Sequence, residues 1–159
     1  MRLPPLTKAD MTVEQRELFD ALVANSVGRG ESFVLDEHRA WGFLIANGPS
    51  GPTVRPDPLT LSSDELSALA DTFAGQIASR DLAFAPTARK LYDALLAPIE
   101  SSLTKTTSLV IIPDGPLWRV PFQALRTPRN TFVIEERAVS YTASVAALAA
   151  LESRRRARP

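Results

Sequence analysis

The side chains able to perform polar chemistry are few in this sequence of 159 residues. It contains no cysteine, which excludes a cysteine nucleophile, a thiolate metal site and a disulfide within the chain. Its one histidine, His38, lies between the charged residues Glu37 and Arg39. A metal site needs several converging ligands, and one histidine with scattered carboxylates does not supply them. We therefore interpret His38 as a solvated surface residue and expect no metal and no cofactor.

Serine nucleophiles and an isolated carboxylate are the remaining candidates. Ser32, Ser140 and Ser144 do not lie in a nucleophile-elbow pattern or beside a plausible base. Asp114 follows an apolar run, at a position where α/β proteins often place ligands. Because no second polar partner is identifiable, a turn is the favoured interpretation, with Asp114 capping local N–H groups and Gly115 adopting an unusual φ. The sequence predicts no catalytic, cofactor-binding or metal residue.

The element that would position these residues is the apolar run at residues 109–112, Leu-Val-Ile-Ile. Such a run is typical of a strand buried on both faces in the middle of an α/β sheet. Three residues are expected beside it: Phe73, Leu95 and Phe122. Turn residues, Pro113-Asp114-Gly115-Pro116, then stop the strand. Trp118 and Phe122 are expected in the core, and Pro121 argues against a regular central strand there.

Apolar spacing and turn residues predict the other elements. Helices are expected at about 12–25, 63–79, 86–97 and 144–151. Further strands are expected at 32–35, 39–46, 132–134 and 138–141, with a loop at 47–52 and a turn at 128–130. Ser62 and Glu65 form a capping box at the second helix, Pro86 opens the third, and Ser144 caps the last. This alternation predicts the α/β class.

Charge and hydropathy restrict the environment and the partners. Eighteen basic and eighteen acidic residues cancel, so no global field favours nucleic acid or an anionic membrane. Four arginines near the C-terminus (Arg154, Arg155, Arg156 and Arg158) are interpreted as solvated. The N-terminus lacks an apolar signal core, and no apolar run approaches membrane-spanning length. We expect a cytoplasmic protein that binds neither nucleic acid nor membrane.

The central stretch resembles the CHAT domain, a caspase-like domain often found behind tetratricopeptide repeats in bacterial proteins. The likeness rests on the apolar strand, Pro113-Asp114-Gly115, Trp118-Arg119, Pro121-Phe122 and Ala124-Leu125. It extends over about residues 31–151 and implies a partial caspase-like fold, with a mixed sheet flanked by helices. The domains expected are an N-terminal arm and helix (1–30), a CHAT-like domain (31–153) and a basic tail (154–159). Residues 1–25 also resemble the start of carboxymuconolactone decarboxylase-like proteins.

The same resemblance implies a chemistry that this chain does not supply. Peptide-cleaving CHAT proteins pair a histidine with a cysteine, each at the end of a later core strand, and these segments have no counterpart here. The expected function is a truncated, catalytically inactive, pseudoprotease-like half that serves as an interaction module or survives as a gene remnant. One alternative is the N-terminal half of a split cysteine peptidase, completed by a separate chain that carries the dyad. Another is an unrelated small binding protein.

The partner expected from the sequence is a polypeptide. A strand that is apolar on both faces needs covering layers and neighbours along both edges. Few other strands of this character are predicted, so one sheet edge should be unpaired. The sequence therefore predicts self-association or binding to a protein partner.

Overall fold

The computed structural model describes residues 39–48, 51–104, 106–148 and 150. The chain divides into two compact units, Met1–Pro58 and Leu59–Pro159. Several predictions lie outside the described residues: the helix at 12–25, the strand at 32–35, Ser32, His38 and the four arginines near the C-terminus. Within the described residues, no helix is long and apolar enough to cross a membrane.

The first described elements are the paired strands β1 (Arg39–Gly48) and β2 (Gly51–Ser62). The structure confirms the strand predicted at 39–46. The loop predicted at 47–52 is too long, because β1 runs to Gly48 and β2 begins at Gly51. Strand β2 was not predicted, and its three prolines are unusual in a strand. Pro52, Pro56 and Pro58 share one parity, so their nitrogens face the same edge of β2. Among the described strands β2 pairs with β1 alone, and proline is tolerated at a strand edge that needs no N–H donor.

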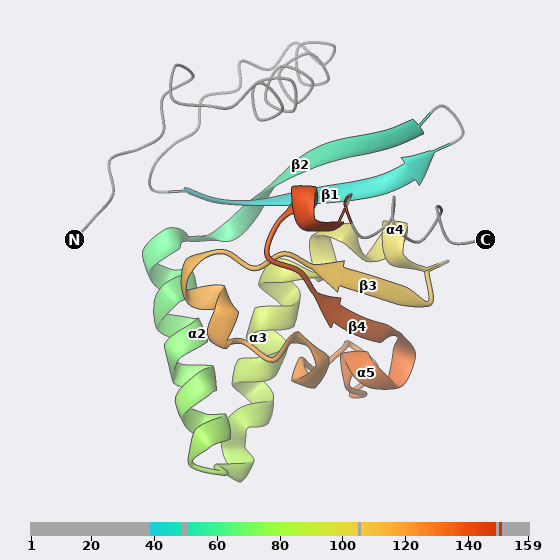
Figure 1. The fold of residues 1–159 in the computed structure, drawn as a ribbon. Helices are drawn as coiled ribbons and strands as arrows, with labels where there is room; N and C mark the ends of the chain where they lie inside the picture. The colour runs from blue at the N-terminus through green and yellow to red at the C-terminus, as the bar shows by residue number, and fades with distance from the viewer. Residues whose placement is uncertain (1–38, 49–50, 105, 149, 151–159) are drawn as a thin grey trace. The chain divides into compact units, whose positions relative to one another are not determined.

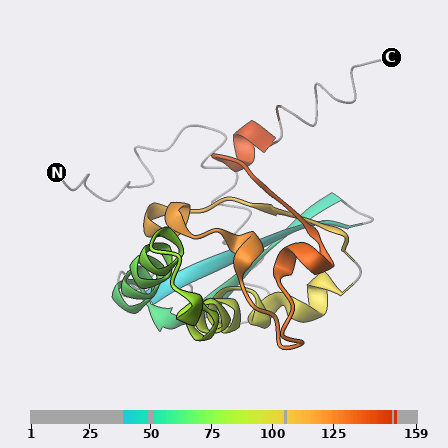
Figure 2. The same cartoon turned by 90° about the horizontal axis from the view of Figure 1, so that it is seen from below.

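Two helices form the centre of the second unit, α2 (Ser63–Ala78) and α3 (Ala85–Leu95). Ser62 begins α2 with the predicted capping box: its Oγ accepts from Glu65 N–H, and the Glu65 carboxylate accepts from Ser62 N–H at 2.9 Å. These hydrogen bonds lower the pKa of Glu65. Pro86 lies in the first turn of α3, as predicted. Figures 1 and 2 show the two helices side by side, joined by the 3-10 turn η2 (Leu82–Phe84).

The core of this unit is helical. It contains large and small apolar side chains from both helices and from the segments after them: Leu66, Ala70, Phe73, Ala88, Leu91, Tyr92, Leu96, Val120, Phe122, Leu125 and Val133. The Phe84 ring lies against Phe73, at 6.3 Å between centroids, and stacks on Phe132 at 6.2 Å. Leu95 is only half-buried, while its neighbours Ala94 and Leu96 are buried.

After α3 the chain passes through short elements: η3 (Ala97–Ile99), α4 (Glu100–Leu103), β3 (Ser108–Ile111), η4 (Gly115–Arg119), η5 (Phe122–Ala124), α5 (Val133–Glu136) and β4 (Ala138–Tyr141). Strands β3 and β4 pair in parallel, with Leu109 opposite Val139 and Ile111 opposite Tyr141. The predicted α/β class is confirmed, and the described strands form two separate two-stranded sheets.

Full burial of the strand at 109–112 is contradicted. Residues of β3 alternate between exposed and half-buried, and Val110 is 41% exposed. The physical reason is that only one face of β3 is packed, because Leu109 and Ile111 share a face while Ser108 and Val110 share the other. A short apolar run does not reveal from its composition which of its faces is covered.

The strand predicted at 132–134 is also wrong. Residues 133–136 form the single-turn helix α5, in which Phe132 N–H donates to the Glu135 carboxylate at 2.6 Å. This local hydrogen bond satisfies an N–H group at the helix start, and it outweighs the β propensity of Phe132, Val133 and Ile134. The predicted strand at 138–141 is confirmed as β4, and Ser144 Oγ accepts from Ala147 N–H at 3.1 Å, which confirms the predicted cap.

Candidate functional site

The segment after β3 contains the motif residues predicted from the sequence. Pro113 is buried, whereas Asp114 and Gly115 are exposed. Gly115 has φ +50°, which confirms the predicted unusual backbone conformation. Among the described residues, the Asp114 side chain caps no N–H group, so that part of the prediction is wrong. Instead the Asp114 carbonyl oxygen accepts from Leu117 N–H at 3.1 Å and closes the turn through the backbone.

Trp118 and Phe122 have opposite environments. Phe122 is 4% exposed and lies in the core as predicted. Trp118 is 52% exposed, so its predicted core position is wrong. The chain forms the 3-10 helix η4 here, and Val120, two residues later, is the side chain that is buried. Burial therefore shifts from the larger tryptophan to the smaller valine, which leaves the indole on the surface.

Tyr141 joins β4 to this motif. Its hydroxyl accepts from Phe122 N–H at 2.8 Å and donates to the Gln123 side-chain oxygen at 2.5 Å. The Tyr141 and Phe122 rings meet edge to face, with centroids 6.3 Å apart. Burial raises the pKa of Tyr141 above its usual value, so the phenol stays protonated and keeps its donor at neutral pH. These contacts hold Pro121 and the start of η5 beside the end of β4.

An open groove of about 420 Å³ lies between α2 and this segment. We call it the α2 groove. Its walls are mainly apolar and come from three places along the chain: Ala74, Ile77 and Ala78; Trp118, Arg119, Val120, Pro121 and Gln123; and Tyr141. Arg119 pairs with Asp71 of α2 at 2.5 Å, so the charge at the rim is neutralised within the chain. The α2 groove suits an uncharged apolar group and carries no evident acid–base pair.

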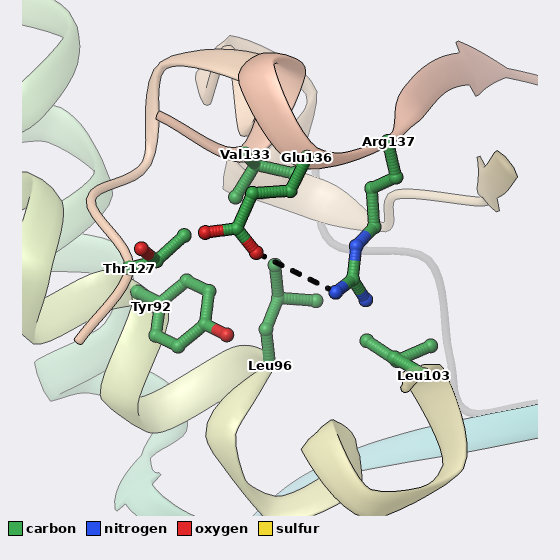
Figure 3. Close-up of a pocket in the computed structure, with 7 residues that line it drawn as sticks. All are labelled: Tyr92, Leu96, Leu103, Thr127, Val133, Glu136 and Arg137. Carbon is green, nitrogen blue, oxygen red and sulfur yellow. Dashed lines mark ion pairs between the residues drawn. The ribbon is translucent and has the colours of Figure 1, made fainter. Parts of the chain in front are cut away.

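A second set of polar side chains lies between the end of α3 and α5 (Figure 3). Glu136 and Arg137 face Tyr92, Leu96 and Leu103 there, and the side chains fill the space between them. The Arg137 guanidinium is largely buried and lies 3.7 Å from Glu136 and 4.0 Å from Glu100. A buried cation requires such partners.

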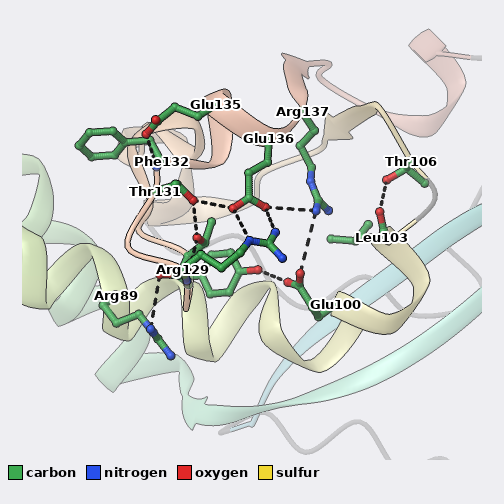
Figure 4. A network of polar contacts seen from close by, with 12 residues as sticks. Arg89, Glu100, Leu103, Thr106, Arg129, Thr131, Phe132, Glu135, Glu136 and Arg137 are labelled. Carbon is green, nitrogen blue, oxygen red and sulfur yellow. Dashed lines mark hydrogen bonds and ion pairs between the residues drawn. The ribbon is translucent and has the colours of Figure 1, made fainter.

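Hydrogen bonds extend this cluster to the turn at 128–130 (Figure 4). The Tyr92 hydroxyl donates to Glu100, and Arg129 pairs with Glu136. Thr131 Oγ1 donates to Glu136 at 2.6 Å. The hydrogen bond from Arg129 is the largest cause that lowers the pKa of Glu136 to about 2, while burial and the bond to Glu100 raise the pKa of Tyr92. The cluster fastens α5 to α3 and leaves no group free for catalysis among its described members.

Sequence analysis missed this cluster because its members are far apart in the chain. The only local signal was the run Glu135-Glu136-Arg137, which lies between the strands predicted at 132–134 and 138–141. The described serines have structural surroundings: Ser140 lies on β4, with its Oγ 3.5 Å from the Leu109 carbonyl oxygen, and Ser144 is a helix cap. No cluster of three or more metal-binding side chains occurs among the residues described.

Comparison with protein families matches residues 85–159 to the CHAT domain, which is consistent with a portion of such a domain. This range starts at α3 and includes β3, the Pro-Asp-Gly turn, Pro121-Phe122 and β4, which are the features that suggested the family. CHAT is a caspase-like, peptidase-related family. No curated protein and no solved structure matches the chain.

The CHAT match also limits the sequence-based interpretation. It begins at residue 85, whereas the resemblance was placed at about residues 31–151. The likeness of residues 1–25 to carboxymuconolactone decarboxylase-like proteins has no support from the comparisons. Within the CHAT match there is neither histidine nor cysteine, because His38 is the only histidine of the chain and precedes it.

Replacing Gly115 by alanine should destabilise the protein, and replacing Gly75 should do the opposite. A Cβ at either position meets nothing within 4 Å, but only Gly115 has positive φ. Gly115→Ala should cost about 1–2 kcal/mol from backbone strain. Gly75→Ala, inside α2, should gain about 0.5–1 kcal/mol. Urea unfolding of both variants measures the difference, and equal effects would show that the turn conformation is not required.

The polar side chains between α3 and α5 are called here the Glu136 cluster: Tyr92, Glu100, Arg129, Thr131, Glu136 and Arg137. This cluster should make the stability of the protein depend on pH in the acid range. The pKa of Glu136 is lowered from 4.5 to about 2, so its stabilisation is present above about pH 4.5 and is lost as the pH falls toward 2. Glu136→Gln should cost about 1–2 kcal/mol at pH 7, allowing for the exposure of Arg129. Its melting temperature should then approach that of the wild type as the pH falls through this window. Asp114→Asn is the control, since the Asp114 side chain is exposed and caps no N–H group. A constant gap between Glu136→Gln and wild type from pH 5 to pH 2 would contradict this assignment.

Proposed function

We propose that this chain provides a catalytically inactive, pseudoprotease-like portion of a CHAT domain that acts as a protein-interaction module. The observation that carries the proposal is that residues 85–159 match the family and contain neither histidine nor cysteine. A cysteine peptidase of the caspase kind needs a histidine-activated thiolate. Ser144 and the Glu136 cluster offer no substitute, because the Ser144 hydroxyl caps a helix and the cluster's charged groups are paired with one another.

Support for the interaction role comes from the outer edge of β3. The Thr107 carbonyl oxygen accepts from Ala138 N–H at 2.9 Å, and the Ile111 carbonyl oxygen accepts from Thr142 N–H, just after β4, at 3.0 Å. By strand alternation, the backbone N–H and C=O groups of Ser108 and Val110 therefore point to the opposite edge. No described strand pairs with that edge. Residues 106–112 carry no charge, whereas natural edge strands are usually protected by charges or proline. An extended polypeptide segment can therefore add beside β3 through backbone hydrogen bonds.

The alternative function, one half of a split CHAT peptidase, draws on this same edge. In that case the added segment belongs to a chain that carries the histidine and the cysteine. Peptide hydrolysis that appears only when the two chains are mixed would favour this alternative over a purely non-catalytic module.

The isolated chain should hydrolyse no peptide above background. The test is a peptide-library assay of the purified chain, with a trace of an active cysteine peptidase added in a parallel sample to prove that turnover is detectable. A thiol-directed probe should leave the chain unlabelled, because it has no cysteine. Activity that stays with the protein through successive purification steps and is abolished by one serine substitution would refute catalytic inactivity.

Binding at the β3 edge should be weakened by a charge. Val110→Lys places a cation on a residue that is already partly exposed, so the fold should tolerate it. Affinity for a polypeptide carrying the remaining strands of a CHAT domain should fall about tenfold or more, as measured by titration calorimetry. Ile134→Lys is the matched control, since Ile134 is also an exposed apolar residue but lies on α5. Equal binding by wild type and Val110→Lys would exclude this edge as the contact.

A further inference from the structure

An exposed apolar residue at the start of η2, which follows α2, lies close to the α2 groove. Leu82 is 91% exposed, an unfavourable state for a leucine in water. It lies four residues after Ala78, which lines the groove, so the two Cα atoms are at most about 14 Å apart. A projecting leucine and an open apolar groove therefore lie at the same end of α2.

The two features are chemically complementary. The α2 groove has partly exposed apolar walls, Ile77, Trp118 and Tyr141, and its volume of about 420 Å³ exceeds that of one leucine side chain. The Arg119–Asp71 ion pair at the rim leaves no net charge to attract an ionic ligand. An uncharged branched side chain such as that of leucine fits both the size and the charge of the site.

The proximity of Leu82 to the groove favours a symmetric pair. A twofold axis that passes close to the end of α2 would let each copy insert its Leu82 into the groove of the other. The four exposed side chains, Leu82, Ile77, Trp118 and Tyr141, offer roughly 400 Å² per copy. That is about the apolar share of the ~800 Å² which each partner buries in a standard interface.

We propose that two copies of this chain form a twofold dimer in which Leu82 of each copy occupies the α2 groove of the other. This proposal does not depend on the proposed function, because it uses α2, η2 and η4 and not the β3 edge. The occupant is a second copy of the chain, and the recognised group is the Leu82 side chain.

Sedimentation equilibrium of the full chain, from low micromolar to several hundred micromolar, tests the dimer. The wild type should dimerise reversibly, and Leu82→Glu should raise the dissociation constant about a hundredfold, because each dimer loses two leucine contacts. Ile134→Glu is the matched control and should leave the dissociation constant unchanged, since it alters an exposed apolar residue on α5. Circular dichroism melts verify that each variant is folded.

A mixing experiment tests the reciprocal geometry. Leu82→Glu keeps an intact groove and loses the projection, whereas Trp118→Ala keeps the projection and damages the groove. Each variant alone should be monomeric, but a mixture should form a heterodimer with one intact contact, about tenfold tighter than either homodimer. Failure of the mixture to associate more tightly than the separate variants would overturn the reciprocal contact.

The remaining outcomes are also decisive. A wild-type chain that stays monomeric over the whole concentration range would overturn the dimer, as would equal effects of Leu82→Glu and Ile134→Glu. Species that grow beyond the dimer would exclude the closed twofold arrangement. Loss of dimerisation in Val110→Lys but not in Leu82→Glu would place self-association at the β3 edge, so failure of this inference is distinguishable from failure of the proposed function.

Discussion

Packing of α2 against α3 is the interaction on which the other described residues from Leu59 onward depend. Ala70 and Ala88 are fully buried, and such small side chains let the two helices approach closely. Phe73 and Leu91 are buried beside them, and each large apolar side chain contributes about 1.5–3 kcal/mol on burial. The elements after α3 are each only three to five residues long, so they depend on Val120, Phe122, Leu125 and Val133 being inserted into this helical core.

Strands β3 and β4 pack on the rest of the unit with one face only, and for this reason they remain half-buried. The pair has four residues in each strand, and Leu109, Ile111 and Val139 turn one face inward. Parallel strands are usually covered on both faces, and a two-stranded sheet is marginal in isolation. The strand pair therefore gains its order from the packed face and from Tyr141, whose hydroxyl connects β4 to the backbone of Phe122.

Features that depend on residues close together in the chain were predicted correctly, whereas features that depend on distant contacts were not. The capping box at Ser62, the proline at the start of α3, the turn glycine at 115 and the cap at Ser144 are decided within a few residues, and all four predictions are confirmed. The burial of residues 109–112 and of Trp118 depends on which distant elements cover them, and both predictions were wrong. The Glu136 cluster, contributed by α3, α4 and α5, gave no recognisable local pattern.

The role of α2 shows that the CHAT portion is not structurally independent of what precedes the match. The family match begins at residue 85, yet Phe73 of α2 lies against Phe84, and Phe84 stacks on Phe132 inside the match. This aromatic row crosses the start of the match, and the Asp71–Arg119 ion pair crosses it again. Without α2, the inner face of α3 around Leu91 would lose its cover. The folding unit therefore begins before the recognisable family sequence, in agreement with the compact unit that starts at Leu59.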